Sequence, residues 1–437
     1  EKVCQLQLEN SMLKPNIEAN EKKDILNIPS ENVALKQQQD IPKPNDEQKA
    51  IPAGLEAMQQ VKDNEIEKQQ IADDEKKQDN NNYTYPAINF DMFYSASKLL
   101  NTFIGHICYV NNIDYSTFDG GQFICFGSYD TKVHVWEVGT NEQVQLFEEH
   151  SDRVSCVKFS PYHYYNYHRH IICSSSYDKT FRFWDIKDNR QLKIFREHKR
   201  WISGIEFSSF NGGRYLCSGS GDKTIRLCDV GTSKLLHIFN GHESDICCLD
   251  ISPLQSNSNN NHIGVIGGNG YTICSGSNDK TIRVWDIETA KQLTLFKGHK
   301  KFVNSVKYGS NESANIILSG STDKSVRLWD IRSNAQIQTF NGHTKNVTCA
   351  EYSPFVVNNK EASASSNVIC SGSHDRTIRF WDIRSNKNAL HMIKEEKIED
   401  NGITCLKFVP VKKKEKNCGC NFNLYYGSAN GYIRIWG

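Results

Sequence analysis

The sequence predicts an all-β protein built from repeated four-stranded antiparallel units, which follow a long polar segment. The first observation is a recurring motif that combines Gly or Ser, an Asp turn and an apolar run. Its copies read CFGSYDTKVHVWE (125–137), CSSSYDKTFRFWD (173–185), CSGSGDKTIRLCD (217–229), CSGSNDKTIRVWD (274–286), LSGSTDKSVRLWD (318–330), CSGSHDRTIRFWD (370–382) and, in degenerate form at the C-terminus, YGSANGYIRIWG. Self-similarity of this kind is the signature of a repeat architecture.

The second observation is a Gly-His or Glu-His pair at a constant distance from each motif. The step from Trp136 to His150 is 14 residues, and so is the step from Trp184 to His198. The step from a His to the next motif Trp, or to the Cys in its place, varies from 30 to 43 residues. Insertions are therefore confined to one loop of each unit.

The third observation is the pattern of short runs inside each unit. One unit contains four runs of strand length: VSCVKF (154–159), IICSSS (171–176), TFRFWD (180–185) and QLKIF (191–195). Alternating runs of this length, with turn signals between them, are typical of antiparallel strands. Each unit should therefore form one four-stranded blade.

The Gly-His … Trp-Asp frame resembles the WD-repeat family over residues 97–437, and this resemblance implies a circular β-propeller. The last motif ends at Trp436 without a fourth strand, whereas SKLLNTFIGH (97–106) reads like the mid-chain fourth strand SKLLHIFNGH (233–242). We therefore expect strand 97–103 to complete the last blade. This closure gives a seven-bladed β-propeller over residues 93–437, without long exposed sheet edges.

Residues 1–92 form a separate acidic, low-complexity segment. They contain 11 Lys and Arg against 18 Asp and Glu, six of the ten prolines and no Trp. Such a composition buries too little apolar surface to offset the entropy of chain ordering. The sequence therefore predicts a disordered tail before the propeller.

Charge, cysteine usage and hydropathy indicate which partners and which cellular compartments to expect. The propeller segment has a modest positive surplus without a dense basic stripe, so nucleic-acid binding is not expected. The 15 cysteines mostly recur at strand positions, as small buried hydrophobes do, and this usage favours the reducing cytoplasm or nucleus. No run of 18 apolar residues occurs, so we expect no membrane span.

In the WD-repeat family, His, Ser, Asp and Trp of one unit form a hydrogen-bonded chain across the blade. The resemblance carries this structural role to His150–Ser174–Asp178–Trp184, His242–Ser275–Asp279–Trp285, His299–Ser319–Asp323–Trp329 and His343–Ser371–Asp375–Trp381. The same residue types make up a hydrolase triad. An active site occurs once in a chain, whereas this set recurs, and the structural interpretation is therefore preferred.

No motif of an enzyme or cofactor site is present. The sequence lacks a phosphate-binding loop, an HExxH zinc motif and a dinucleotide-binding glycine pattern. The pair Cys418 and Cys420 lacks the second ligand pair that a zinc site needs. We expect no catalytic residues, cofactor, metal or small-molecule substrate.

The predicted binding surface is the face with short loops, because the long insertions gather on the opposite face. This face is also the usual docking face in the resembled family. By repeat alignment, the side chains at its mouth that we expect to bind a partner are Tyr109, Tyr129, Arg153, Tyr177, Trp201, Asp245, Phe302 and His374. Exposed aromatic residues are typical interface anchors. Packing of some of these rings between adjacent blades is the alternative.

Two functions follow from the resemblance. The first is a non-catalytic scaffold or adaptor that binds other proteins or peptide segments. The alternative is a substrate-recognition subunit of an enzyme complex, such as a ubiquitin ligase or a histone-modifying assembly, in which the propeller reads a basic tail. Only Asp245 supplies an acidic side chain at the predicted mouth, which favours the scaffold.

Overall fold

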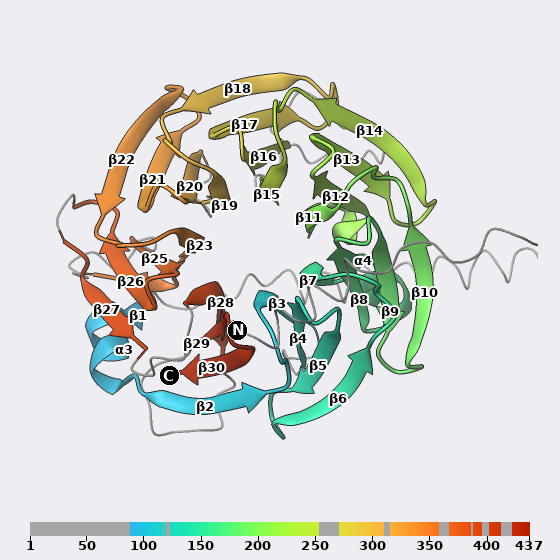
Figure 1. Cartoon of the computed structure of the whole chain (residues 1–437), viewed down its shortest axis with the longest axis horizontal. Coiled ribbons are helices and arrows are strands. Elements are labelled where there is room, and N and C mark those ends of the chain that lie inside the picture. The colour runs from blue at the N-terminus through green and yellow to red at the C-terminus, as the bar shows by residue number, and fades with distance from the viewer. Residues whose placement is uncertain are drawn as a thin grey trace, which may run out of the picture. The chain divides into compact units, whose positions relative to one another are not determined.

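In the computed structural model, seven four-stranded antiparallel sheets surround a common centre (Figure 1). The structure describes residues 88–116, 118, 123–252, 271–309, 315–357, 367–385, 388–395, 402–411 and 422–437. All of them belong to the compact unit Pro86–Gly437. The expected seven-bladed β-propeller is confirmed.

The strands of each blade run from the centre outward in chain order. Blade one consists of β3 (Val110–Tyr115), β4 (Phe123–Ser128), β5 (Val133–Glu137) and β6 (Glu142–Phe147). Blade two consists of β7 (Val154–Phe159), β8 (Ile171–Ser176), β9 (Phe181–Asp185) and β10 (Arg190–Phe195). Blade three consists of β11 (Ile202–Phe207), β12 (Tyr215–Ser220), β13 (Thr224–Asp229) and β14 (Lys234–Asn240).

The remaining blades repeat this order, except that the chain's N-terminal strand completes the last one. Blades four to seven consist of β15 (Ile246–Ile251), β16 (Thr272–Ser277), β17 (Thr281–Asp286) and β18 (Gln292–Lys297); β19 (Val303–Tyr308), β20 (Ile316–Ser321), β21 (Ser325–Asp330) and β22 (Ala335–Asn341); β23 (Val347–Tyr352), β25 (Val368–Ser373), β26 (Thr377–Asp382) and β27 (His391–Lys394); and β28 (Ile403–Pro410), β29 (Phe422–Ser428), β30 (Tyr432–Trp436) and β2 (Leu99–Ile104).

Strand β2 closes the ring as the sequence predicts. It pairs antiparallel with β30, from Leu99 opposite Trp436 to Ile104 opposite Tyr432. In Figure 1, β2 lies at the outer edge of the blade that also holds the C-terminus. The first and last parts of the propeller therefore share one sheet.

Burial follows from the position of a strand in its blade. All six residues of β8, IICSSS, are buried, because both faces of this strand pack against neighbouring blades. The recurrent cysteines Cys125, Cys173, Cys217 and Cys274 are buried and unbridged, and burial raises the pKa of each thiol. They fill space in the core as small apolar side chains.

Polar side chains on the inner strands join each blade to the next. The Ser155 hydroxyl donates to the carbonyl oxygen of Ile202 at 2.6 Å, and the Thr348 hydroxyl donates to that of Ile403 at 2.8 Å. The Thr404 hydroxyl donates in the same way to Val110 of blade one. These bonds explain why small polar residues recur at this position of the inner strand.

The boundary of the predicted tail is wrong by a few residues. Strand β1 (Ile88–Asn89) pairs in parallel with β24 (Phe355–Val356), and helix α3 (Phe90–Ala96) follows it. Phe90 and Phe93 are buried among residues of blades six and seven. The polar composition of the flanking sequence concealed this short apolar segment, and Ile88–Ala96 belong to the folded propeller unit rather than to the tail. The rest of the predicted tail, residues 1–87, lies outside the described residues.

Besides the loop that holds β24, two loops between a first and a second strand contain short helices that the repeat pattern does not predict. Helix α4 (Pro161–Tyr167) lies between β7 and β8, and the short helix η1 (Asn211–Gly213) lies between β11 and β12. Of the two longest insertions, residues 253–270 and 358–366 lie outside the described part of the chain.

Candidate functional site

The four predicted sets of His, Ser, Asp and Trp are each brought together as one hydrogen-bonded chain. In blade five, His299 Nδ1 lies 2.9 Å from the Asp323 carboxylate and Nε2 lies 2.8 Å from the Ser319 hydroxyl, which accepts from Trp329 Nε1 at 2.8 Å. The corresponding distances in the other three sets lie between 2.7 and 2.9 Å. Each chain ties the turn of its blade to the second and third strands.

Burial and hydrogen bonding fix the protonation of these sets. Burial lowers the pKa of His150, His242 and His299, so that the rings are neutral at pH 7. For Asp323, burial alone would raise the pKa, but hydrogen bonds from His299 and Ser325 outweigh it and hold the pKa below its ordinary value. The neutral His therefore donates from Nδ1 to an ionised carboxylate.

This geometry also argues against a hydrolase active site at these sets. The Ser319 hydroxyl contacts a His that contacts an Asp, but Ser319 is 0% exposed and its oxygen already accepts from Trp329. A carbonyl substrate would have to reach that oxygen. The equivalent Ser174, Ser275 and Ser371 are also 0% exposed. Each set therefore stabilises its own blade.

Three blades depart from the complete set. In blade three, His198 contacts Asp222 and Ser218, with Cys228 in the position of the Trp. In blade seven, Glu395 contacts the Tyr426 hydroxyl, which accepts from Trp436 Nε1 at 3.1 Å, and it pairs with Arg434. In blade one, His106 contacts Asp130 at 2.8 Å, but Phe126 replaces the Ser.

Five of the eight predicted partner-binding residues come together at the mouth of the propeller. We define the mouth cluster as Tyr109 and Tyr129 of blade one, Arg153 and Tyr177 of blade two, and Trp201 of blade three. Tyr109 stacks on Tyr129 with centroids 5.1 Å apart, and Tyr177 stacks on Trp201 at 4.9 Å with only 7° between the planes. The Arg153 guanidinium lies 4.5 Å from the centre of the Tyr129 ring and 5.6 Å from that of Tyr177.

Local sequence explains how the cluster forms. In each blade, one residue precedes the turn Asp; it is Tyr129 in blade one, Tyr177 in blade two and Gly221 in blade three. A Cβ atom at Gly221 would lie 2.5 Å from the Trp201 ring, so only Gly lets this ring lie flat across the turn. The rings are half-buried and stack across the boundaries between blades, which leaves part of each one open to solvent.

The other three predicted residues lie elsewhere on the same face. Phe302 of blade five is 46% exposed. Asp245 accepts from Arg200 at 3.0 Å, and His374 of blade six is half-buried, with its pKa lowered by burial. Within the described residues, no ring contact joins Phe302 or His374 to the mouth cluster.

Below the mouth, the inner strands carry a ring of charged side chains that the sequence analysis missed. The fifth residue of each inner strand is ionisable, and we call these seven residues the charge ring: Asp114, Lys158, Glu206, Asp250, Lys307, Glu351 and Lys407. The inner strands that bear them surround the centre of the molecule (Figure 1). Reading the repeat by position within the inner strand would have revealed this pattern.

Opposite charges of the ring pair across the blades. Lys158 lies 2.7 Å from Glu206, and Lys307 lies 3.0 Å from Asp250 and 3.7 Å from Glu206. Burial alone would lower the pKa of Lys158, but the charge of Glu206 outweighs it and raises that pKa. Burial raises the pKa of Asp250, and the charge of Glu206 adds to this rise.

A cavity of about 290 Å³ is lined both by residues of the mouth cluster and by residues of the charge ring. Tyr129, Tyr177 and Trp201 line it, together with Lys158 and Glu206 of the charge ring. The cavity therefore offers aromatic faces near its rim and paired charges deeper in the channel. Such a surface can bind an amphipathic side chain or a short peptide segment.

Comparison with known families agrees with this architecture. A family model described as WD domain, G-beta repeat matches residues 97–137, 141–185, 189–229, 233–286, 290–330 and 334–382. The chain belongs to the WD40 repeat family. Strands β28, β29 and β30 of this WD40 protein lie beyond the last matched segment, so the family model does not cover the seventh blade that the structure shows. No match was found among curated proteins. In the described part of the chain, no helix has the length and hydropathy needed to cross a membrane.

Proposed function

We propose that this WD40 protein is a non-catalytic scaffold or adaptor that binds peptide segments of other proteins at its short-loop face. The observation that carries the proposal is the mouth cluster, in which four aromatic rings and one Arg converge from three blades. Aromatic and Arg side chains dominate the energetics of protein interfaces. These residues adjoin the ends of strands, and backbone hydrogen bonds such as Tyr129 N–H to Tyr109 and Tyr177 N–H to Arg153 hold them there. Little ordering is therefore needed when a partner binds.

The electrostatics of the cluster indicate which segments would bind. Arg153 already covers one face of Tyr129 and approaches Tyr177, so a Lys or Arg of a partner would meet a like charge there. An acidic residue of the partner would instead be attracted to Arg153 and could form a charge-assisted hydrogen bond. A neighbouring aliphatic or aromatic side chain would pack on Trp201. We therefore propose peptides that combine an acidic and an apolar residue.

The same electrostatics argue against a dedicated reader of basic tails. The charge ring has four acidic and three basic members, so it offers no strong negative field to a basic segment. Recognition within an enzyme complex stays the second candidate, with an acidic-apolar degron or docking motif as its ligand. The scaffold proposal includes no cofactor, nucleic acid, membrane or small-molecule substrate. The buried, unbridged thiols support a cytoplasmic or nuclear location.

A displayed peptide library tests the proposal. The full-length protein should enrich peptides with an acidic residue beside an apolar one, and Trp201→Ala and Arg153→Ala should each weaken binding of the enriched peptides at least tenfold. Leu293→Ala, at a 56% exposed site on outer strand β18, is the matched control and should bind as the wild type does. Unchanged binding by both mouth variants would show that partners dock elsewhere.

A further inference from the structure

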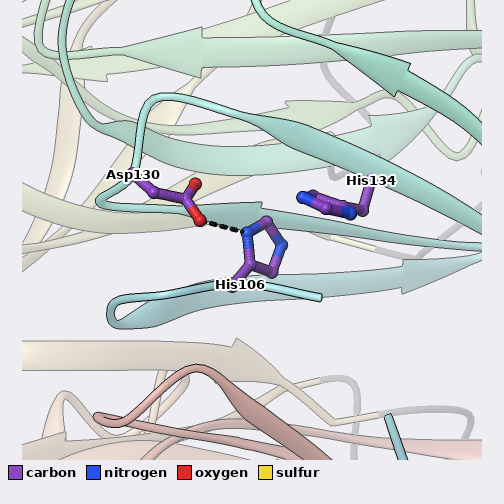
Figure 2. A group of neighbouring side chains, drawn as sticks. All are labelled: His106, Asp130 and His134. Atoms are coloured by element: carbon purple, nitrogen blue, oxygen red, sulfur yellow. Dashed lines mark hydrogen bonds and ion pairs between the residues drawn. The ribbon is translucent and has the colours of Figure 1, made fainter. Parts of the chain in front are cut away.

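The blades differ from one another both in their interior and at the surface. In blade one, His134 takes the place that an Arg has in the other blades, and it lies beside His106, which is hydrogen-bonded to Asp130 (Figure 2). Both histidines are only 4% exposed, so a partner protein does not reach them. In blade five, by contrast, the difference lies on the short-loop face, in the run Lys300–Phe302 before β19.

Blade five has the same order of residue types as blade three, but its aromatic ring is unstacked. In both blades, two basic residues and then an aromatic residue directly precede the inner strand, as Lys199–Trp201 and as Lys300–Phe302. Trp201 stacks on Tyr177. The Phe302 ring is 46% exposed and contacts no other ring among the described residues. An apolar side chain of a partner would therefore find this ring free.

The basic residues of blade five are also unpaired. In blade three, Arg200 pairs with Asp245 at 3.0 Å. We define the basic patch as Phe302 together with four exposed lysines, none of which forms an ion pair with a described residue: Lys300, Lys301, Lys324 and Lys345. Their positive charges are therefore available to a ligand.

Hydrogen bonds join the two segments of blade five that carry the patch. The backbone N–H of Lys300 donates to the Asp323 carboxylate at 2.9 Å, and that of Thr322 donates to the carbonyl oxygen of Phe302 at 2.9 Å. Lys324 lies in the same turn as Thr322 and Asp323. The loop before β19 and the turn between β20 and β21 therefore form one continuous surface.

Blade six brings the fourth lysine to this surface. The Asn304 side-chain amide donates to the carbonyl oxygen of Val347 at 2.7 Å, which joins the inner strands of the two blades. Lys345 precedes Val347 by two residues. Burial lowers the pKa of His374, and the charge of Lys345 lowers it further, so this lysine lies close to the mouth.

No exposed carboxylate offsets these charges on the short-loop face of blades five and six, as far as the structure describes them. The turn residues Asp323 and Asp375 have side chains that are only 5% and 4% exposed, and they accept from His299 and His343 within the recurrent sets. The mutual repulsion of unpaired like charges is relieved when an oppositely charged ligand binds.

We propose that the basic patch is a second docking site on the short-loop face, and that it binds an acidic segment of a partner protein that also carries an apolar side chain. Carboxylates of the segment pair with the lysines, and the apolar side chain packs on Phe302. Complementary charge of this kind accelerates association and orients the partner, while the aromatic ring supplies apolar contact area.

This inference rests on the proposed function, because it assigns to the same face a second site for the same class of ligand. The mouth cluster gathers residues of blades one to three, whereas the basic patch belongs to blades five and six. A partner with two acidic-apolar motifs on a linker that spans the mouth would occupy both sites. Its binding would then exceed that of either motif alone through effective concentration.

A peptide in which Glu residues flank a single Phe tests the proposal. The fluorescein-labelled peptide is titrated with full-length Arg153→Ala/Trp201→Ala protein, which lacks the two anchors of the mouth cluster, and binding is followed by fluorescence anisotropy. We expect this double variant to bind the peptide, and binding to weaken as salt is added, because exposed charges are screened. A peptide with Lys in place of Glu should not bind.

Further substitutions in the same double variant locate the site. Addition of Lys300→Glu and Lys301→Glu should weaken binding at least tenfold, and addition of Phe302→Ala at least threefold, with unchanged far-UV spectra. Lys234→Glu with Lys291→Glu is the matched control, because it makes the same change in net charge at exposed positions beside the outer strands, and it should bind within twofold of the double variant.

Three results would overturn the proposal. The first is a double variant that does not bind the peptide, which leaves the mouth cluster as the site of the proposed function. The second is equal loss of binding with the patch and control substitutions, which would indicate net charge alone. The third is an RNA oligonucleotide that binds more tightly than the peptide and displaces it, which would make the patch a nucleic-acid site.

Discussion

Replacement of Phe93 by Ala should strongly destabilise the propeller, although Phe93 precedes the repeats. The Phe93 ring is 0% exposed, stacks on Phe355 with centroids 4.4 Å apart, and lies 5.9 Å from Phe380 of blade six. Removal of a fully buried Phe side chain costs about 3–5 kcal/mol, because both the transfer energy and the surrounding contacts are lost. We expect the free energy of unfolding to fall by that amount.

Urea unfolding of the full-length protein, followed by Trp fluorescence, measures this effect. Met92→Ala is the matched control, because Met92 lies on the same helix α3 but is 50% exposed. Its free energy of unfolding should stay within about 0.5 kcal/mol of the wild type. Equal stability of the Phe93 and Met92 variants would refute the argument that α3 belongs to the folded core.

Three further predictions concern closure, the recurrent sets and pH. A chain that starts at Gly105 lacks β2 and should aggregate, whereas one that starts at Pro86 should keep the melting temperature of the full chain; a soluble, equally stable product from Gly105 would refute the closure argument. Asp323→Ala removes the acceptor for His299 and should lower the free energy of unfolding by about 1–3 kcal/mol in urea, and an unchanged midpoint would contradict a structural role. Stability should also fall as the pH is lowered from 7. The unfolded chain takes up protons on His near pH 6.5 and on Asp near pH 3.9, whereas the folded pKa values of His299 and Asp323 lie lower, so a flat profile from pH 7 to 3 would contradict the assigned sets.

The features that the sequence predicts correctly depend on local signals that repeat. The number of blades follows from counting the motif, and the role of strand 97–103 follows from its likeness to a mid-chain strand. The chain His299–Ser319–Trp329 could be assigned because the same spacing recurs in other units. In such a fold, each copy confirms the interpretation of the others.

The features that the sequence misses depend on contacts between segments or on departures from the repeat. Phe90 and Phe93 bury themselves against strands more than 250 residues further along the chain, and nothing in their polar surroundings indicates this packing. The mouth cluster combines Tyr177 with Trp201 through a Gly whose importance appears only when the ring lies across it. The charge ring has a sequence signal, at the fifth position of each inner strand, but it changes sign from blade to blade.

Comparison of the blades within this one chain separates stabilising positions from positions that are free to serve function. The turn Asp is present in blades one to six and accepts from a His in each. The residue directly before it, which needs no hydrogen bond to complete the set, is Tyr129, Tyr177, Gly221, Asn278, Thr322 or His374. Since the same backbone turn presents each of these side chains at the mouth, their diversity costs the fold little. The propeller can therefore change its binding surface without changing its stabilising sets, except in blade one, where Phe126 and His134 alter the set itself and leave two buried imidazole nitrogens without a hydrogen-bond partner among the described residues.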